Sequence, residues 1–112
     1  KAYKISKRFD DDISSVCASF NIELKNKKIK DIKIAYGGMA SIPKRAKHCE
    51  KKLLNSFFTA KNIDKAKEAL EEDFKPISDM RAGSKYRMEI AKSLLQKCFL
   101  EITHKKLIRI NN

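Results

Sequence analysis

The stretch Ile13-Ser-Ser-Val-Cys-Ala-Ser-Phe-Asn-Ile-Glu-Leu24 decides the fold, because apolar and polar residues alternate along it more clearly than anywhere else in the chain. A period of two places successive side chains on opposite faces of a β-strand. One face of this predicted strand is apolar and carries Val16, Ala18, Phe20, Ile22 and Leu24. The other face is mostly polar and carries Ser15, Cys17, Ser19, Asn21 and Glu23. We therefore expect a strand that buries one face only.

Two further alternating segments flank this strand. Upstream, the side chains expected to face the core are Tyr3, Ile5 and Phe9, and those expected on the opposite face are Lys4, Ser6 and Arg8. Downstream, Lys25-Asn-Lys-Lys28 has the composition of a tight turn, and the alternation resumes from Ile29 to Tyr36. The second and third strands should therefore form an antiparallel hairpin. Gly37-Gly38 ends the third strand, where the backbone reverses or lies close to another segment.

Apolar residues recur at helical spacing in three later segments. The first helix is expected to begin at Pro43, with Ser41 as its cap, and to run for three or four turns. The second should begin at Asn62 and end at Pro76, and the third, a long helix, should begin at Ser84. The predicted buried stripes are Ala46, Cys49, Leu53 and Phe57; Ile63, Ala66, Leu70 and Phe74; and Tyr86, Ile90, Leu94, Cys98 and Ile102, reinforced by Ala91 and Leu95.

The order of these elements, strands first and helices afterwards, is typical of an α+β protein. We predict a two-layer sandwich in which a three-stranded antiparallel sheet is followed by three helices packed on one face. A chain of 112 residues is long enough for one modest core, so residues 1–112 should form a single domain.

The chain is strongly basic, with 26 lysines and arginines against 14 aspartates and glutamates and a formal net charge of +12. Clustered cations supply the part of nucleic-acid binding that does not depend on sequence. The cations gather in two groups, Lys25, Lys27, Lys28, Lys30 and Lys33 around the hairpin and Lys44, Arg45, Lys47, Lys51 and Lys52 on the first helix. Few aromatic residues lie among them, so we expect a solvated surface and no nucleic-acid partner.

The cysteines indicate a reducing compartment. Cys17, Cys49 and Cys98 are more than thirty residues apart and form no C-x-x-C pair, so we expect buried free thiols. No apolar run approaches the roughly 20 residues that span a bilayer, and no secretory pattern precedes the first strand. These features predict a cytoplasmic protein without a membrane partner. Because the first residue is Lys1 and not Met, we expect the chain to be a piece of a longer protein.

Three consecutive carboxylates, Asp10-Asp-Asp12, follow the first strand. Neighbouring side chains on an extended backbone point to opposite sides, and the spacing differs from that of a calcium-binding loop. His48 and His104 are interpreted as surface residues. We therefore expect neither a metal site nor a catalytic pair, and Asp10 and Asp12 receive no role.

Three motifs occur in a recognisable order: Ala2-Tyr-Lys-Ile-Ser-Lys-Arg-Phe-Asp-Asp-Asp-Ile13; Tyr36-Gly-Gly-Met-Ala40 with Arg45-Ala46; and Ser78-Asp-Met-Arg-Ala82 with Tyr86-Arg87. Together they resemble the C-terminal subdomain of the FAD-binding part of xanthine dehydrogenase. The flavoprotein subunits of carbon monoxide dehydrogenase share that subdomain. The resemblance extends over residues 2–103, and the third motif is most similar to the bacterial small-subunit type.

The resemblance implies that residues 1–112 are the C-terminal subdomain of a larger FAD-binding subunit of a molybdenum hydroxylase. Absent upstream subdomains would hold most of the FAD, and the other partners would be domains or subunits that carry iron-sulfur clusters and the molybdenum cofactor. The implied activity belongs to purine catabolism, with electrons passing from a purine such as xanthine through these cofactors to NAD. The isolated chain is expected to be inactive and to contain no catalytic residue.

Within the first motif, the resemblance implies that Lys4 contacts the flavin and that Arg8 and Asp11 lie on a loop bordering the flavin and the NAD pocket. The strand alternation separately places Lys4 and Arg8 on one face. Cations there favour negative charge on the flavin, and a nearby carboxylate opposes it, so the cluster would tune the flavin potential. Family members carry a second arginine at the position of Phe9, so any cation switch that needs this arginine is not expected.

Two other functions stay open at this point. One is a free-standing basic module that binds nucleic acid through its sheet, although the polar strand faces lack the aromatic residues that such sheets use. The other is a dimerisation domain. Asp79 and Arg81 are interpreted as loop anchors or subunit-interface residues, and Gly37-Gly38 as a close approach of the backbone at the sheet end.

Overall fold

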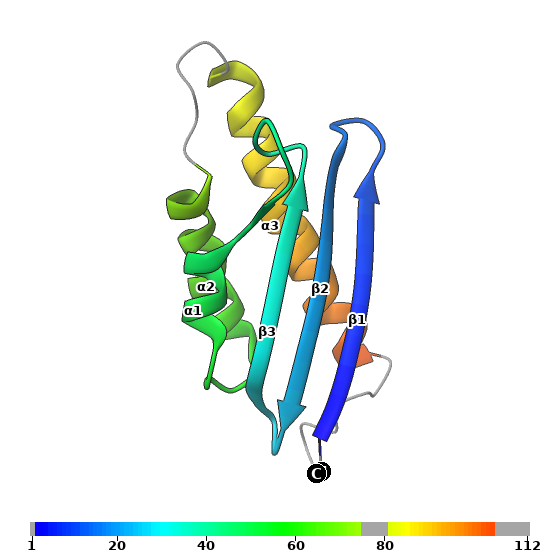
Figure 1. The fold of residues 1–112 in the computed structure, drawn as a ribbon, viewed down its shortest axis with the longest axis vertical. Helices are drawn as coiled ribbons and strands as arrows, with labels where there is room; N and C mark the ends of the chain where they lie inside the picture. The colour runs from blue at the N-terminus through cyan, green and yellow to red at the C-terminus, as the bar shows by residue number, and fades with distance from the viewer. Residues whose placement is uncertain (1, 75–80, 105–112) are drawn as a thin grey trace.

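The computed structural model describes residues 2–74 and 81–104 and has the predicted α+β architecture. Its elements are β1 (Ala2–Asp11), β2 (Val16–Lys25), β3 (Lys28–Gly37), β4 (Lys44–Arg45), α1 (Lys47–Leu53), α2 (Ala60–Asp73) and α3 (Arg81–His104). The strands form one antiparallel sheet in the order β1-β2-β3-β4. The helices lie on one side of this sheet, as predicted (Figure 1). Neither described stretch contains a helix with the length and apolar character that crossing a membrane requires.

The strand register aligns the apolar side chains in rows on the helix side of the sheet. Ile5 lies opposite Ile22, which lies opposite Ile32, and the next rows bring Phe9, Ala18 and Tyr36 together. All of these side chains are buried. Full burial of an aliphatic or aromatic side chain of this size contributes about 1.5–3 kcal/mol. The alternation along residues 13–24 therefore predicted the core face of β2 correctly.

The core-facing prediction for Tyr3 was wrong, because its side chain is 45% exposed. Tyr3 does lie on the same face as Ile5 and Phe9, but it is at the outer end of β1. Helix α3 contacts β1 at Lys7, whose Nζ lies 3.0 Å from Oε1 of Glu101 in the last described turn of that helix. Alternation therefore predicts the face of a side chain correctly, but it does not predict whether the end of a strand is covered by another element.

Helix α1 is shorter and begins later than predicted. It spans Lys47–Leu53 with Ala46 as its N-cap, so Pro43 and Ser41 precede it and take no part in its first turn. Residues 44–45 instead form β4, a strand that the sequence did not predict and that pairs with β3. Phe57 lies beyond the helix and is 50% exposed, so its assignment to the buried stripe was also wrong.

The buried residues of the other two helices largely agree with the predicted stripes, but both helices begin at other residues than predicted. Thr59, and not Asn62, is the N-cap of α2, and its Oγ1 accepts the Asn62 amide N–H at 3.3 Å. Ser84 lies inside α3, which begins at Arg81. Tyr86 is 50% exposed, so its assignment to the buried stripe was wrong. The remaining stripe residues are at least partly buried: Ile63, Ala66, Leu70, Phe74, Ile90, Ala91, Leu94, Leu95, Cys98 and Ile102. The predicted stop at Pro76 lies outside the described residues.

A row of aromatic rings connects the sheet to both long helices. Ring centroids are separated by 6.0 Å for Phe9 and Phe20, 6.3 Å for Phe20 and Tyr36, and 5.6 Å for Tyr36 and Phe74, all with edge-on geometry. The Tyr36 hydroxyl donates a 2.7 Å hydrogen bond to the carbonyl of Ala91 in α3. Burial, followed by nearby thiols and a carboxylate, holds the pKa of Tyr36 well above its ordinary value. Tyr36 therefore acts as a neutral donor that fixes α3 against β3.

Glu50 attaches α1 to the edge of β3. Its carboxylate is 8% exposed and accepts the Ile34 amide N–H at 2.8 Å and the Arg45 guanidinium at 2.7 and 3.0 Å. The Ile34 carbonyl accepts the Ala46 N–H at 2.8 Å. Both backbone groups of Ile34 are thus satisfied just past the end of β4. The hydrogen bonds to Glu50, and then its charge, raise the pKa of Arg45.

We predict that Glu50→Gln destabilises the domain by about 1–3 kcal/mol, because the amide NH2 group would replace the oxygen that accepts from Arg45 Nη2 and the guanidinium would lose its charged partner. Urea unfolding of the variant should show a lower midpoint. Glu72→Gln is the matched control, because Glu72 is exposed on α2 and should change stability by less than about 0.5 kcal/mol. Equal midpoints for Glu50→Gln and the unmodified chain would contradict the role given to Glu50.

Candidate functional site

The sheet has one face that no described element covers, and we call it the open face. Strand β1 presents Lys4, Ser6, Arg8 and Asp10 on this face, and they alternate with residues that face the helices. The prediction that Lys4 and Arg8 lie on the same face is therefore confirmed. The register continues these rows across β2 and β3: Lys4, Glu23 and Asp31; Ser6, Asn21 and Lys33; Arg8, Ser19 and Ala35; and Asp10, Cys17 and Gly37. The open face is therefore a polar surface that carries Lys4 and Arg8 near one edge.

Arg8 is paired with Asp10 and not with Asp11. Its Nη2 lies 3.2 Å from Oδ1 of Asp10, two residues further along the same strand face. Both side chains are more than half exposed, at 66% and 55%. Solvent screens an ion pair of this kind, so it contributes little to stability. Its charges are available to a ligand that covers the open face, where a lower dielectric strengthens them.

Asp11 lies on the other side of β1 and holds the turn that follows the strand. Its Oδ1 accepts both the backbone N–H and the hydroxyl of Ser14 at 2.8 Å, and its carbonyl accepts the Ser15 N–H at 3.0 Å. These two bonds from Ser14, the backbone bond first, lower the pKa of Asp11. The structure therefore brings Lys4 and Arg8 to one face and places Asp11 at the end of the strand.

The glycine pair is a close approach of the backbone, as interpreted from the sequence. Gly38 has a φ of +85°, and a Cβ atom built on it would lie 2.4 Å from the carbonyl oxygen of Ser15. A Cβ atom on Gly37 would lie 2.8 Å from the Sγ atom of Cys17. The end of β3 thus lies against the β1–β2 turn. Ser19 and Ala35 lie in the adjoining row. Because these residues and the glycines are small, few side-chain atoms project from this part of the open face.

The three carboxylates at positions 10–12 do not converge. Asp10 and Asp11 point to opposite sides of the strand, and Asp12 is exposed in the turn. Within residues 2–74 and 81–104, no group of three or more histidine, cysteine, aspartate or glutamate side chains could hold a metal ion. Asp79 and the side chain of Arg81 lie outside the described part of the chain, so their expected anchoring roles stay predictions.

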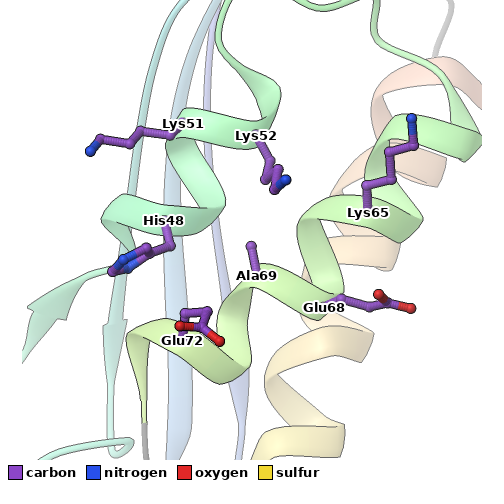
Figure 2. Close-up of a pocket in the computed structure, with 7 residues that line it drawn as sticks. All are labelled: His48, Lys51, Lys52, Lys65, Glu68, Ala69 and Glu72. Atoms are coloured by element: carbon purple, nitrogen blue, oxygen red, sulfur yellow. The ribbon is translucent and has the colours of Figure 1, made fainter.

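A groove of about 500 Å³ lies on the helix side, between α1 and α2. Figure 2 shows Ala69 projecting between the two helices, with charged side chains around it. The lining residues are His48, Lys51, Lys52, Lys65, Glu68, Ala69 and Glu72. Because Lys4 and Arg8 point away from the helices, this groove and the predicted site residues belong to different sides of the domain.

Two buried carboxylates near this groove were missed by the sequence reasoning. One is Glu50, and the other is Asp73, which is 5% exposed at the end of α2. Asp73 accepts the backbone N–H groups of His48 and Cys49 at 2.7 and 2.9 Å, and its Oδ1 lies 2.9 Å from Nδ1 of His48. It therefore caps α1 from a different helix. The sequence did contain one signal for Asp73, because it lies three residues after Leu70 and therefore next to the apolar stripe of α2.

The two thiols on the helix side of the sheet, those of Cys49 and Cys98, are poor nucleophiles. Cys49 and Cys98 are buried, and burial raises the pKa of Cys49 far above its ordinary value and that of Cys98 to about 12. Cys17 is partly exposed on the open face. The expectation of buried thiols is thus confirmed for Cys49 and Cys98 and wrong for Cys17.

Comparison with known proteins decides the family. A family model described as the CO dehydrogenase flavoprotein C-terminal domain matches residues 1–102. The chain belongs to this family. The resemblance found in the sequence motifs is therefore confirmed.

Individual relatives place the flavoprotein domain in longer proteins. The medium chain of glyceraldehyde dehydrogenase from Sulfolobus acidocaldarius is 33% identical over 100 residues, covering 89% of this chain and 36% of the relative. The putative xanthine dehydrogenase FAD-binding subunit of Escherichia coli K12 is 24% identical over 99 residues, covering 88% and 34%. The chain thus spans about a third of the length of these relatives. The solved structure of quinoline 2-oxidoreductase from Pseudomonas putida 86 shares the fold, with a TM-score of 0.75 and 16% identity, covering 94% and 39%.

We predict that the Asp11 carboxyl titrates below its ordinary pKa of 3.8, and that Ser14→Ala moves this pKa upward by removing one of the two donors. Because the folded-state pKa is lowered, the stabilisation from Asp11 is fully present above the unfolded-state value and is lost as the pH falls through the folded-state value. Carbon-13 NMR of the Asp11 carboxyl measures this directly. Ser41→Ala, in an exposed loop, serves as the control, and an unchanged Asp11 pKa in Ser14→Ala would rule out the hydroxyl contribution.

Proposed function

We propose that this flavoprotein domain forms one wall of the FAD site in the flavin subunit of a molybdenum hydroxylase. The observation that carries the proposal is the open face, on which Lys4 and Arg8 project from β1 while the helices pack on the opposite side. Membership of the CO dehydrogenase flavoprotein family supports the choice of a flavin as the ligand. The name of the E. coli relative, an FAD-binding subunit, supports it as well.

The residues of the open face fit one wall of an FAD site, but they do not surround the whole cofactor. Lys4 and Arg8 supply positive charge, and the bonded pair Ser6 and Asn21, with a 2.7 Å contact, supplies a fixed polar surface between the two cations. A flat aromatic ring system can approach the sheet around Ser19, because the small side chains there leave room for it. The chain offers no glycine-rich loop for the phosphates of the dinucleotide, so upstream subdomains would hold them.

In this proposal the side chains act through charge and position. Lys4 would lie beside the isoalloxazine ring, and Arg8 would raise the positive potential at the border with the NAD pocket, which favours negative charge on the ring. Asp10 opposes that effect, because it is the carboxylate paired with Arg8. Asp11 fixes the turn of residues 12–15, which would border the cofactor. When bound, FAD supplies the electron-transfer chemistry, and the chain itself supplies no acid or base.

For the complete enzyme we propose oxidation of a purine such as xanthine, with electrons passing through molybdenum and iron-sulfur centres in partner domains or subunits to FAD and then to NAD. Relatives named as xanthine dehydrogenases support this substrate. A second candidate is an aldehyde, which the 33% identity to a glyceraldehyde dehydrogenase chain favours. The free thiols agree with a cytoplasmic location for either enzyme.

We predict that Arg8→Gln and Asp10→Asn shift the midpoint potential of bound FAD in opposite directions in the full-length protein. Removing the cation lowers the potential, and removing the carboxylate raises it, each by about 30 mV, which for a two-electron couple corresponds to about 1.4 kcal/mol. Spectroelectrochemical titration measures both shifts. Lys85→Gln is the control, because Lys85 is exposed on α3, away from the open face. Shifts of the same sign, or no shift, would refute the proposed position of the pair.

The same variants separate the flavin step from substrate oxidation in the assembled enzyme. Their rate of NAD reduction should change, whereas their rate with an artificial dye that takes electrons at the molybdenum centre should not. Equal loss of both rates would contradict a role confined to the flavin. Turnover of xanthine but not of glyceraldehyde supports the purine proposal, and the reverse result supports the aldehyde.

A further inference from the structure

The connection between α1 and α2, residues 54–59, is fixed against the β2–β3 hairpin. Asn55 donates its N–H to the Ile29 carbonyl at 2.8 Å, Ile29 donates to Ser56 at 2.8 Å, and Phe58 donates to Lys27 at 3.0 Å. We call this segment the connector. Its three backbone hydrogen bonds extend the sheet beyond β3, so the connector has a defined shape although it contains no helix or long strand.

The connector exposes two large apolar side chains. Leu54 is 41% exposed and Phe57 is 50% exposed, whereas the neighbouring Phe58 is buried in the core. The positive φ of 64° at Asn55 turns the chain between them. Nζ of Lys28 lies 5.3 Å from the centroid of the Phe57 ring, which keeps a cation beside this apolar surface. A rigid segment that presents an aromatic and an aliphatic side chain resembles the centre of a protein interface.

The two segments that contain and border the connector carry positive charge only. Residues 24–30 and residues 51–62 contain no aspartate or glutamate, and the hydrogen bonds of the connector hold these two segments side by side. Their lysines are Lys25, Lys27, Lys28, Lys30, Lys51, Lys52 and Lys61. The apolar pair thus has a rim of positive charge, and an acidic rim on a partner would complement it.

We propose that the connector is a docking surface for a protein partner whose contact patch is apolar at its centre and acidic at its rim. The aliphatic side chain of Leu54 favours a protein over a nucleic acid, because a phosphate backbone would engage the lysines and leave Leu54 in water. The connector lies at the β3 edge of the sheet, whereas Lys4 and Arg8 lie on β1 at the other edge (Figure 1). The apolar centre of this docking surface, Leu54 and Phe57, is therefore separate from Lys4 and Arg8.

The test uses the full-length protein and a fluorescein-labelled synthetic helix of glutamate and leucine, with the leucines on one face. Fluorescence anisotropy should show binding that weakens with added salt. Phe57→Ala and Lys52→Glu should each weaken binding about tenfold, as expected for a central aromatic residue and for reversal of a rim charge. A second peptide, in which glutamine replaces leucine, should bind much less tightly.

Matched controls lie on α3, far along the chain from the connector. Tyr86→Ala removes an aromatic residue that is also 50% exposed, and Lys85→Glu makes the same charge change at an exposed position. Both should change the affinity less than twofold, a difference that net charge alone cannot produce. The proposal is overturned if the controls weaken binding equally or if the glutamine peptide binds as well. Tighter, Phe57-dependent binding of a single-stranded RNA or of phosphatidylserine vesicles also overturns it.

Discussion

The three long strands place their apolar side chains on one face of the sheet, and the burial of this face under the helices is the constraint on which the rest of the structure depends. Because alternation is strict along β1, every side chain of that strand that leaves the core face must appear on the open face. Lys4 and Arg8 occupy the open face for this reason, because each directly precedes a buried residue, Ile5 or Phe9. The polar surface is thus a direct consequence of how the core forms.

Buried carboxylates keep the helix layer on its side of the sheet. Glu50 satisfies the Ile34 N–H where β4 ends, and Asp73 caps α1 from the end of α2. Each carboxylate serves backbone groups that would otherwise be buried without a partner, which costs about 1–3 kcal/mol per group. Together they fix α1 between β3 and α2. The shape of the connector, which runs from α1 back along β3, depends on the same contacts.

The sequence predicted those features that depend on local periodicity. Alternation gave the core face of β2, and helical spacing gave the stripe of α2 from Ile63 to Phe74. Features that depend on contacts between distant segments were missed. The start of α1 is set by the bond between Ala46 and Ile34, and alternation did not predict the exposure of Tyr3 at the end of β1.

In the candidate site, too, local periodicity predicted some features and contacts between side chains decided the others. Strand geometry was sufficient to place Lys4 and Arg8 on one face. Motif resemblance pointed to Asp11 as the neighbouring carboxylate, but Ser14 binds Asp11 at the turn, and Asp10 lies beside Arg8. Residues 8 and 10 share a face because of the period of two, so alternation alone indicates Asp10, and not Asp11, as the neighbour of Arg8.

The most direct measurement of the central claim is the rate at which an alkylating reagent modifies Cys17 in the full-length protein, with FAD bound and after its removal. Cys17 lies on the open face in the row next to Arg8, and buried Cys49 and Cys98 provide internal controls in the same peptide map. If the open face is a wall of the flavin site, bound FAD slows modification of Cys17 and its removal restores the rate, while Cys49 and Cys98 stay unmodified. An identical rate for Cys17 with and without FAD would contradict the account.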